Sequence, residues 1–311
     1  MVYFIVNPAA GNGKAIAAVP VIERVMREIG ARHTFIHTQK PNDIGRVAPL
    51  VDYGEAEAIA CVGGDGAVQE YVGLAVGRDV AFAVVPAGSG NDLIYSMPGG
   101  GRKFGSFEEK IEHYTRAVAK GGTMRADVVA VGKAGGVDGA GGTGDGKVYF
   151  FNIGGTGIDI EVVKDAIPLK RKVGGAAYFI SLVKNVATYR FMAMTLTVDG
   201  KSESGEYLLV AVCNGAYYGG HLRIAPPAVI DDGKITLCII RKLPKAKLLA
   251  VFPLVKPGRH TNFKEVSFIN CSSVELAFEG RRTMNLDGNL CELGGPLSFN
   301  ILQGAVKLVV P

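Results

Sequence analysis

The stretch Ala58-Ile59-Ala60-Cys61-Val62-Gly63-Gly64-Asp65-Gly66 joins a short apolar run to a glycine turn that holds one carboxylate. The run predicts a buried strand over 58–62, and residues 67–76 have a helical pattern. Glycine permits a tight turn and a close approach to the backbone, and a helix N-terminus favours an anion. The stretch therefore predicts a strand–turn–helix unit whose turn faces a phosphate group.

A second turn of this kind, Gly88-Ser89-Gly90-Asn91-Asp92, follows about 25 residues later, the spacing of one βα unit. One such turn alone is typical of any βα connection, but two at this spacing favour a function. Because a carboxylate repels a bare phosphate, either a divalent cation bridges Asp65 and the phosphate or Asp65 accepts a proton from an attacking hydroxyl. Both alternatives indicate a nucleotide phosphotransferase.

Strands and helices alternate through the first part of the chain, which predicts a doubly wound α/β domain with a parallel sheet. Ligands bind at the carboxyl ends of such strands, so Asn7, Asp65 and Asn91 should share one crevice. After about residue 125 the pattern changes to that of an antiparallel β-sandwich, with a helical insertion over 158–189. We expect two domains, 1–125 and 126–311, with the last strand returning to the first domain.

Composition excludes several classes of protein. The chain has 311 residues, 48% of them hydrophobic, and a formal net charge of +5. No apolar run reaches membrane-spanning length, and the five cysteines lack metal-type spacing, which favours a reduced, cytoplasmic setting. We expect no nucleic-acid partner and leave a homodimer open.

Seven motifs follow one another along the chain in a recognisable order. They are Asn7-Pro8-Ala9-Ala10-Gly11, Gly63 to Gly66, Pro86 to Asp92, Asn152 to Asp159, Asn214-Gly215 with Tyr218-Gly219-Gly220, Pro227-Ala228 with Asp232-Gly233, and Asp287-Gly288. In this order the chain resembles bacterial diacylglycerol kinase-like lipid kinases, which are related to sphingosine, ceramide and, more distantly, NAD kinases. The resemblance implies an ATP-dependent kinase that acts on a lipid hydroxyl in a cleft between the two domains.

The resemblance also implies roles for single residues. Those expected at the nucleotide are Asn7, Lys14, Thr38, Gly64, Gly66, Gly88, Ser89, Gly90 and Asn91. Asp65 and Asp92 would hold Mg²⁺-phosphate or orient the acceptor, and Asp287 matches the carboxylate often assigned as general base. Asp232 matches a metal-binding position. The expected cofactors are thus ATP and Mg²⁺.

Three positions depart from the family pattern. Ala67 stands where Thr is usual, Asn289 replaces the Glu of Asp-Gly-Glu, and His221 replaces a third glycine. The loss of a carboxylate at 289 would mean either a substrate other than diacylglycerol or reduced activity. A catalytically weak nucleotide- or lipid-binding protein stays open because of Ala67 and Asn289. A soluble-substrate kinase of the NAD kinase type stays open because it would share the acidic glycine turns, although the motifs of the second half resemble the lipid branch.

A lipid substrate raises the expectation of a peripheral membrane contact. Basic residues accompany the apolar stretch 176–183: Lys164, Lys170, Arg171, Lys172, Lys184 and Arg190. Such a combination suits an anionic membrane surface, although a Lys-dotted face on a core-packed helix is commoner. We expect a protein of the cytoplasm that binds the membrane surface.

Overall fold

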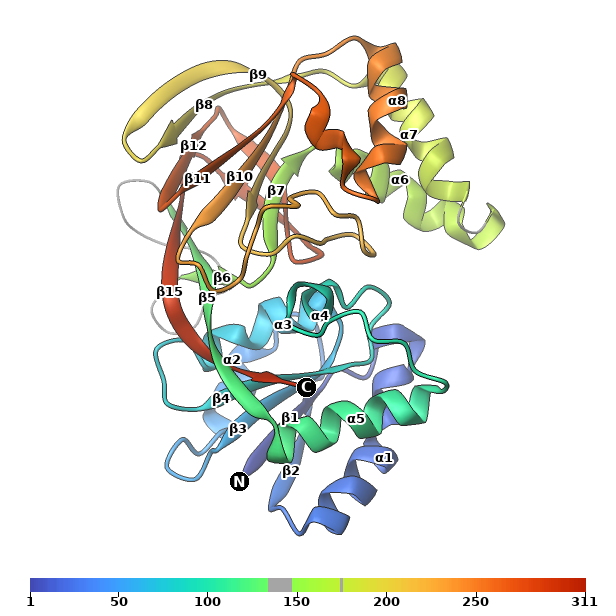
Figure 1. Ribbon diagram of the computed structural model, residues 1–311, viewed down its shortest axis with the longest axis vertical. Helices are drawn as coiled ribbons and strands as arrows, with labels where there is room; N and C mark the ends of the chain where they lie inside the picture. The colour runs from blue at the N-terminus through green and yellow to red at the C-terminus, as the bar shows by residue number, and fades with distance from the viewer. Residues whose placement is uncertain (134–146, 174–175) are drawn as a thin grey trace.

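The computed structural model describes residues 1–133, 147–173 and 176–311, which form two layered units joined by two long strands (Figure 1). The expected fold class, an α/β unit followed by an antiparallel β-sandwich, is confirmed. Within the described residues, no helix is both long enough and apolar enough to span a membrane.

The first unit is a parallel sheet with helices on both faces. Its strands, in the order β4-β3-β1-β2, are β1 (Val2–Val6), β2 (His33–His37), β3 (Ala58–Gly63) and β4 (Ala81–Pro86). Its helices are α1 (Lys14–Ile29), α2 (Ile44–Val47), α3 (Asp65–Tyr71), α4 (Asp92–Ser96) and α5 (Phe107–Lys120), with 3-10 turns η1 (Ala10–Asn12), η2 (Ala48–Leu50) and η3 (Val72–Leu74).

Alternation along β1 shows how the two faces are filled. Phe4 packs in a core that includes residues of α1 and α5, whereas Ile5 packs in one that includes residues of α2 and α3. Because both faces of the sheet are covered, its strands are almost continuously apolar. In β1, β3 and β4, polar side chains therefore appear only where the strands end, whereas the edge strand β2 carries His33, Thr34 and His37.

The second unit is the β-sandwich. Its strands are β5 (Gly122–Lys133), β6 (Val148–Phe150), β7 (Ile153–Gly157), β8 (Met192–Val198), β9 (Lys201–Cys213), β10 (Ile235–Arg241), β11 (Val266–Cys271), β12 (Ser273–Ala277), β13 (Arg281–Leu286), β14 (Asn289–Gly294) and β15 (Leu297–Val310). Phe150, Val210 and Phe299 belong to its inner core.

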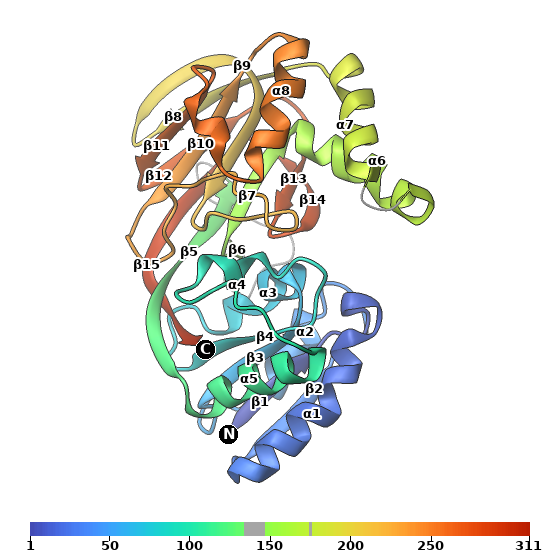
Figure 2. The same cartoon turned by 45° about the vertical axis from the view of Figure 1, so that its right-hand side comes forward.

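Three helices cover one side of this sandwich (Figure 2). The expected insertion forms α6 (Ile158–Val173) and α7 (Ala176–Thr188). A third helix, α8 (Lys245–Val255), was not expected, and a 3-10 turn, η4 (Arg259–Asn262), follows it. Leu182 of α7 and Val251 of α8 share a core with Leu209 of β9, so the helices are part of the packed domain.

Strands β5 and β15 run through both units (Figure 1). They pair antiparallel with each other, and the end of β15 pairs parallel with β4 at Lys307 and Leu308. The chain thus leaves the first unit along β5 and returns to it along β15. We propose a domain boundary at 125/126, inside β5.

Candidate active site

The glycine turns after β3 and β4 touch at the carboxyl edge of the parallel sheet. The N–H groups of Ala87 and Gly88 both donate to the carbonyl oxygen of Gly63, at 2.9 Å each. A Cβ atom on Gly88 would lie 2.3 Å from the Cα atom of Gly64, so a side chain there would push the turns apart. Glycine is required here for close backbone contact.

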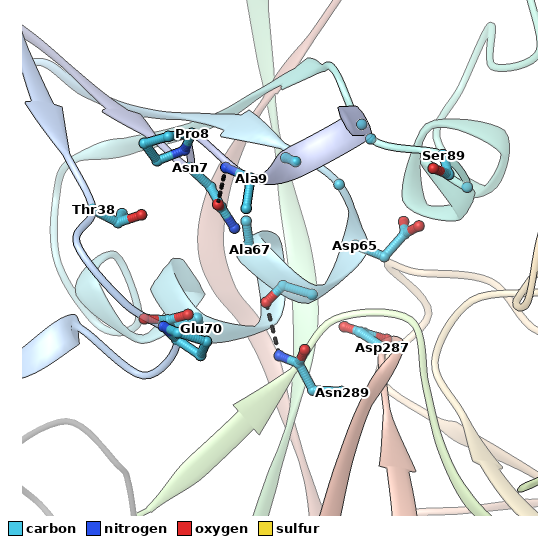
Figure 3. Close-up of a pocket in the computed structure, with 18 of the residues that line it drawn as sticks. Asn7, Pro8, Ala9, Thr38, Asp65, Ala67, Glu70, Ser89, Asp287 and Asn289 are labelled. Atoms are coloured by element: carbon cyan, nitrogen blue, oxygen red, sulfur yellow. Dashed lines mark hydrogen bonds between the residues drawn. The ribbon is translucent and has the colours of Figure 1, made fainter. Parts of the chain in front are cut away.

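A cavity of about 500 Å³ opens at this edge (Figure 3). It is lined by Asn7, Pro8, Ala9, Ala10, Gly11, Thr38, Gln39, Lys40, Pro41, Gly64, Asp65, Gly66, Ala67, Glu70, Gly88, Ser89, Gly90, Asp287, Gly288 and Asn289. The Asn7 Oδ1 atom accepts a hydrogen bond from the N–H of Ala9 at 3.1 Å, which fixes the turn after β1. The cavity is rich in glycine backbone and polar groups, the surroundings that phosphate groups favour.

Asp65 begins α3 and lies between the two turns (Figure 3). Its Oδ1 atom accepts a long hydrogen bond, 3.3 Å, from the N–H of Leu93. Burial, followed by the negative charge of Asp92, raises the pKa of Asp65 to about 7. A cation beside this carboxylate would favour its ionised form.

Asp287 occupies the tight hairpin turn between β13 and β14. Asp287 and Gly288 both have positive φ, +45° and +93°, as a two-residue type I′ turn requires. The turn carries the Asp287 carboxylate to the N–H groups of Phe151, Asn152 and Ile153, which donate to it at 2.6, 2.9 and 2.8 Å. Burial nevertheless raises the pKa of Asp287 to about 7.

Asp92 is buried and joins the two units. Its carboxylate accepts hydrogen bonds from the N–H groups of Gly220 and His221, at 3.0 and 2.6 Å, and lies 3.1 Å from Nδ1 of His221. The centre of the His221 ring lies 3.8 Å from that of Tyr95. His221 has φ +71°, a conformation disfavoured for a residue with a side chain, so these contacts hold it there.

Asn289 forms a second contact between the units (Figure 3). Its amide nitrogen donates to the carbonyl oxygen of Gly66 at 2.9 Å and to Oε1 of Gln69 at 2.7 Å. A Glu side chain has no hydrogen to donate to these two oxygens. Asn289, where the family has Glu, therefore lacks the carboxylate charge and instead connects β14 to α3 through hydrogen bonds.

A second cavity, of about 650 Å³, adjoins the first. It is lined by Asp65, Ser89, Gly90, Asp92, Asn152, Val163, Tyr218, Gly219, Gly220, Leu222, Phe252, Lys256, Asn285, Asp287, Gly288 and Leu290. Five residues line both cavities: Asp65, Ser89, Gly90, Asp287 and Gly288. Away from this junction, Val163, Phe252 and Leu290 give the second cavity an apolar wall.

Most residues expected at the nucleotide meet at the first cavity. Lys14 is exposed at the start of α1 and does not line it. Asn91 does not line it either, because its side chain braces the turn through hydrogen bonds of 2.9 Å to the N–H and carbonyl groups of Gly88.

Asp232 lies outside both cavities, and its Oδ1 atom accepts a bond of 3.0 Å from the N–H of Lys234. In the described part of the chain, no three His, Cys, Asp or Glu side chains are grouped to hold a metal ion.

Sequence reasoning missed Glu70 and the wall contributed by α8. Glu70 lines the first cavity and accepts hydrogen bonds from the N–H of Asp43 at 2.5 Å and from the Tyr71 hydroxyl at 2.6 Å. Its place three residues after Ala67 and four after Gly66, on the same face of α3, was a usable signal. Phe252 had none, because its contact with the cleft depends on how α8 packs.

Comparison with known proteins agrees with this geometry. Residues 1–131 match the diacylglycerol kinase catalytic domain, and residues 153–310, half of the chain, match the YegS C-terminal NAD kinase beta sandwich-like domain. The chain is 25% identical to a diacylglycerol kinase of Mycobacterium tuberculosis over 98% of its length and 93% of the relative's. It is 27% identical to one of Bacillus subtilis, over 99% and 95%.

A crystal structure of a diacylglycerol kinase from Bacillus anthracis shares the fold, with a TM-score of 0.72 and 21% identity, covering all of this chain and 96% of that one. Together, the two domain matches extend over almost the whole chain, in the order in which the cleft needs them. The chain therefore belongs to the family of diacylglycerol kinases and YegS-like lipid kinases, and the protein is a kinase.

Proposed function

We propose that the protein transfers the γ-phosphoryl group of ATP to a hydroxyl group of a lipid such as diacylglycerol. The observation that supports this most is the junction of two unlike cavities at Asp65 and Asp287. The first offers glycine backbone to phosphate groups, and the second offers an apolar wall to acyl chains. An acceptor hydroxyl at the junction would face a bound γ-phosphate.

The nucleotide would occupy the first cavity. Asn7 and Thr38 would contact it, and the N–H groups of the turns at Gly64 and Gly88 would bind its phosphates. Asn91 would act indirectly, since its side chain is used to hold the second turn in place. Lys14, at the exposed start of α1, would act on the phosphates only at long range.

Asp65 is the residue that we assign to Mg²⁺-phosphate. Asp92 and Asp287 each accept a short bond, of 2.6 Å, from a backbone N–H group, whereas the bond of Asp65 to the N–H of Leu93 is 3.3 Å long, with further backbone hydrogen bonds from Asn91 and Asp92. The raised pKa of Asp65 fits this role, because a cation would relieve its repulsion from Asp92. When bound, Mg²⁺ would neutralise the charge that spreads over the transferred phosphoryl group.

Asp287 is the residue that we assign to the acceptor proton. Its carboxylate lines both cavities, and its three backbone donors fix its orientation. A pKa of about 7 is close to the optimum for a general base at neutral pH. Asp92 is then left with a structural task, since it lines only the second cavity and its carboxylate joins the units through Gly220 and His221.

A lipid acceptor must reach the second cavity from a membrane surface. Ile180 and Val183 on α7 and Leu249 on α8 are exposed, at 45%, 43% and 37%, and Phe252 of α8 lines the cavity. We infer that α7 and α8 contact the bilayer beside the cavity mouth. Lys184 contributes little charge here, because it pairs with Asp165 at 2.8 Å, and the side chains of residues 170–172 lie outside the described part of the chain.

The membrane contact can be tested by flotation with vesicles of neutral phospholipid that contain diacylglycerol. Ile180→Gln with Val183→Gln should reduce binding, whereas Leu50→Gln, at a residue 51% exposed on the first unit, should not. Equal binding of all three proteins would remove α7 from the proposed surface.

The activity is tested with γ-labelled ATP, Mg²⁺ and three kinds of acceptor: diacylglycerol in micelles, a sphingoid base in micelles, and NAD in solution. We expect label in a lipid product that disappears in Asp65→Asn. Label in NAD alone would replace the lipid with a soluble substrate, and no labelled acceptor would indicate a binding protein. Phe252→Ala should raise KM for the lipid and leave KM for ATP unchanged, with Leu50→Ala, at an exposed residue of the first unit, as its control.

A further inference from the structure

A third hollow, of about 220 Å³, lies in the β-sandwich unit between the first turn of α6 and strands β7, β8 and β13. It shares no lining residue with the two cavities of the cleft. Its lining includes Arg190, Arg281 and Arg282, against one carboxylate, that of Glu161. The proposed kinase reaction uses none of these residues.

The hollow exists because two strands separate. β13 pairs with β7 only at Asn285 and Leu286. Beyond that point the ladder stops, and the hydroxyl group of Thr156 donates to the carbonyl oxygen of Thr283 at 3.0 Å instead. The space between the diverging strands is polar on both sides, so an apolar ligand would not suit it.

Arg282 enters this space from β13 without a full set of partners. Among the described residues, its buried Nε atom has no hydrogen-bond partner and its Nη2 atom makes a long bond, 3.4 Å, to the carbonyl oxygen of Ala193, while the guanidinium group lies 5.3 Å from the centre of the Phe278 ring. A buried donor without an acceptor costs about 1–3 kcal/mol, more when the group is charged. An acceptor that filled the hollow would remove this cost.

Three arginines border the hollow, against the carboxylate of Glu161 in its lining and that of Glu292, which accepts a hydrogen bond from the Thr283 hydroxyl, so the surrounding charges favour an anion as that acceptor. Glu161 lies 3.3 Å from the ammonium group of Lys164, which balances its charge. Arg190 is exposed and has no ion-pair partner in the described part of the chain, and Arg281 donates to the carbonyl oxygen of Glu292. Guanidinium groups bind phosphate oxygens in pairs of parallel hydrogen bonds, which a hollow bordered by three arginines can supply.

We propose that this hollow is a second ligand site that binds a phosphate group through Arg190, Arg281 and Arg282. The phosphate is either free in solution or part of the headgroup of an anionic phospholipid. Because the site stands apart from the cleft, its occupation does not depend on the kinase reaction.

The test compares the whole protein with two double variants that lose the same charge. Arg190→Gln with Arg281→Gln removes two exposed arginines of the hollow, so the fold should be kept. Arg27→Gln with Arg32→Gln removes two arginines that are 75% and 69% exposed on the first unit. One arm titrates inorganic phosphate by calorimetry, and the other measures flotation with neutral vesicles and with vesicles containing phosphatidylglycerol.

We expect the hollow variant to lose one phosphate-binding component, or to bind anionic vesicles at least about tenfold more weakly, while the control variant matches the wild-type protein. Loss in the phosphate arm assigns a free anion, and loss in the vesicle arm alone assigns a lipid headgroup. The proposal is overturned if the hollow variant matches the control in both arms, or if the wild-type protein binds neither phosphate nor anionic vesicles.

Discussion

Asp65 and Asp287 are both acidic residues whose pKa is raised to about 7, from a usual value of 3.8. The largest cause in each case is burial, which penalises the charged form. Their backbone hydrogen bonds oppose this shift without cancelling it. The chain thus keeps two buried carboxylates in the cleft that ionise near neutral pH. Burying them lowers the stability of the fold at higher pH, which is typical of residues kept for binding or catalysis.

Asp65→Asn should lower kcat at least about 100-fold, because the amide cannot bind Mg²⁺-phosphate as a carboxylate does. The variant should keep the fold.

The same variant also tests the raised pKa of Asp65 in the folded protein. Because of this shift, the stability that the neutral form of Asp65 contributes is present below pH 3.8 and is lost as the pH rises through about 7. Melting curves should therefore show a Tm for the variant, relative to the wild-type protein, that increases between pH 4 and pH 8. A Tm difference that falls with pH would contradict the shift.

Asp287→Asn should behave differently. It should lower kcat by about 10²–10⁴-fold, the usual contribution of a general base, while ATP affinity measured by calorimetry stays close to that of the wild-type protein. Because the new amide would direct N–H groups at the donors of Phe151–Ile153, Tm should also fall. Asp287→Glu would then separate the effect on kcat from the effect on Tm, since it keeps a carboxylate but shifts the position of that carboxylate in the cleft. Weaker ATP binding with unchanged kcat would place Asp287 at the nucleotide.

Single residues at strand ends could be predicted from the sequence because turn chemistry is local. Gly64, Asp65 and Gly88 follow apolar runs directly, so their place at the sheet edge followed from the pattern. The use made of Asp92 could not be predicted, since its partner His221 lies 129 residues further along the chain. A motif shows that a carboxylate is present, but not which N–H groups donate hydrogen bonds to it in the folded protein.

At the scale of elements, β5 and β15 form a two-stranded ribbon that connects the two units (Figure 1). The register of this ribbon shifts between Leu302 and Val306. Asp127 holds the irregular segment: its carboxylate accepts bonds from the N–H groups of Gly304 and Gly233, at 2.7 and 2.6 Å. The Asp-Gly turn that the sequence suggested as a metal position is thus docked on the ribbon through its backbone.

Asp127→Ala should destabilise the protein by about 2–4 kcal/mol, because two N–H groups would lose a charged acceptor. Urea unfolding measures this loss, and hydrogen exchange should quicken at Gly233 and Gly304. Asp231→Ala, at an exposed neighbour in the same turn, is the matched control and should change little. Equal stability of the two variants would show that the bulge does not depend on this carboxylate.

The elements that the sequence failed to predict are those whose pattern is ambiguous. α8 is apolar nearly all round and contains Pro253, so neither a helical stripe nor an uninterrupted helix was visible. β7 is short and consists largely of glycine, which disfavours a strand. Its Gly155 is needed because a Cβ atom there would lie 2.9 Å from the carbonyl oxygen of Val210.

At the scale of the whole molecule, the units are held together by the stacked rings of Phe82 and Phe151, by hydrogen bonds from Ser96 to Asn152 and from Gln69 to Tyr149, and by two polar contacts at the cleft. One joins Asp92 to Gly220 and His221, and the other joins Asn289 to Gly66 and Gln69. Asn289 lines the first cavity and Asp92 the second, so the two contacts would set the distance between the proposed nucleotide and acceptor. Because the ribbon of β5 and β15 is the covalent connection between the units, these two contacts add to the resistance that the shared apolar core offers to a pivot about it.

Removing both contacts should therefore weaken the closed arrangement of the cleft. We expect Asp92→Ala and Asn289→Ala each to raise KM for the lipid modestly, and the double variant to raise it by more than the product of the two, because either contact alone resists the pivot. X-ray scattering should show a larger radius of gyration for the double variant only. Asn289→Glu, which installs the family residue, should resemble Asn289→Ala, since a carboxylate cannot donate to the carbonyl of Gly66. Strictly additive effects with unchanged scattering, or a gain of activity in Asn289→Glu, would show that these contacts do not govern the cleft.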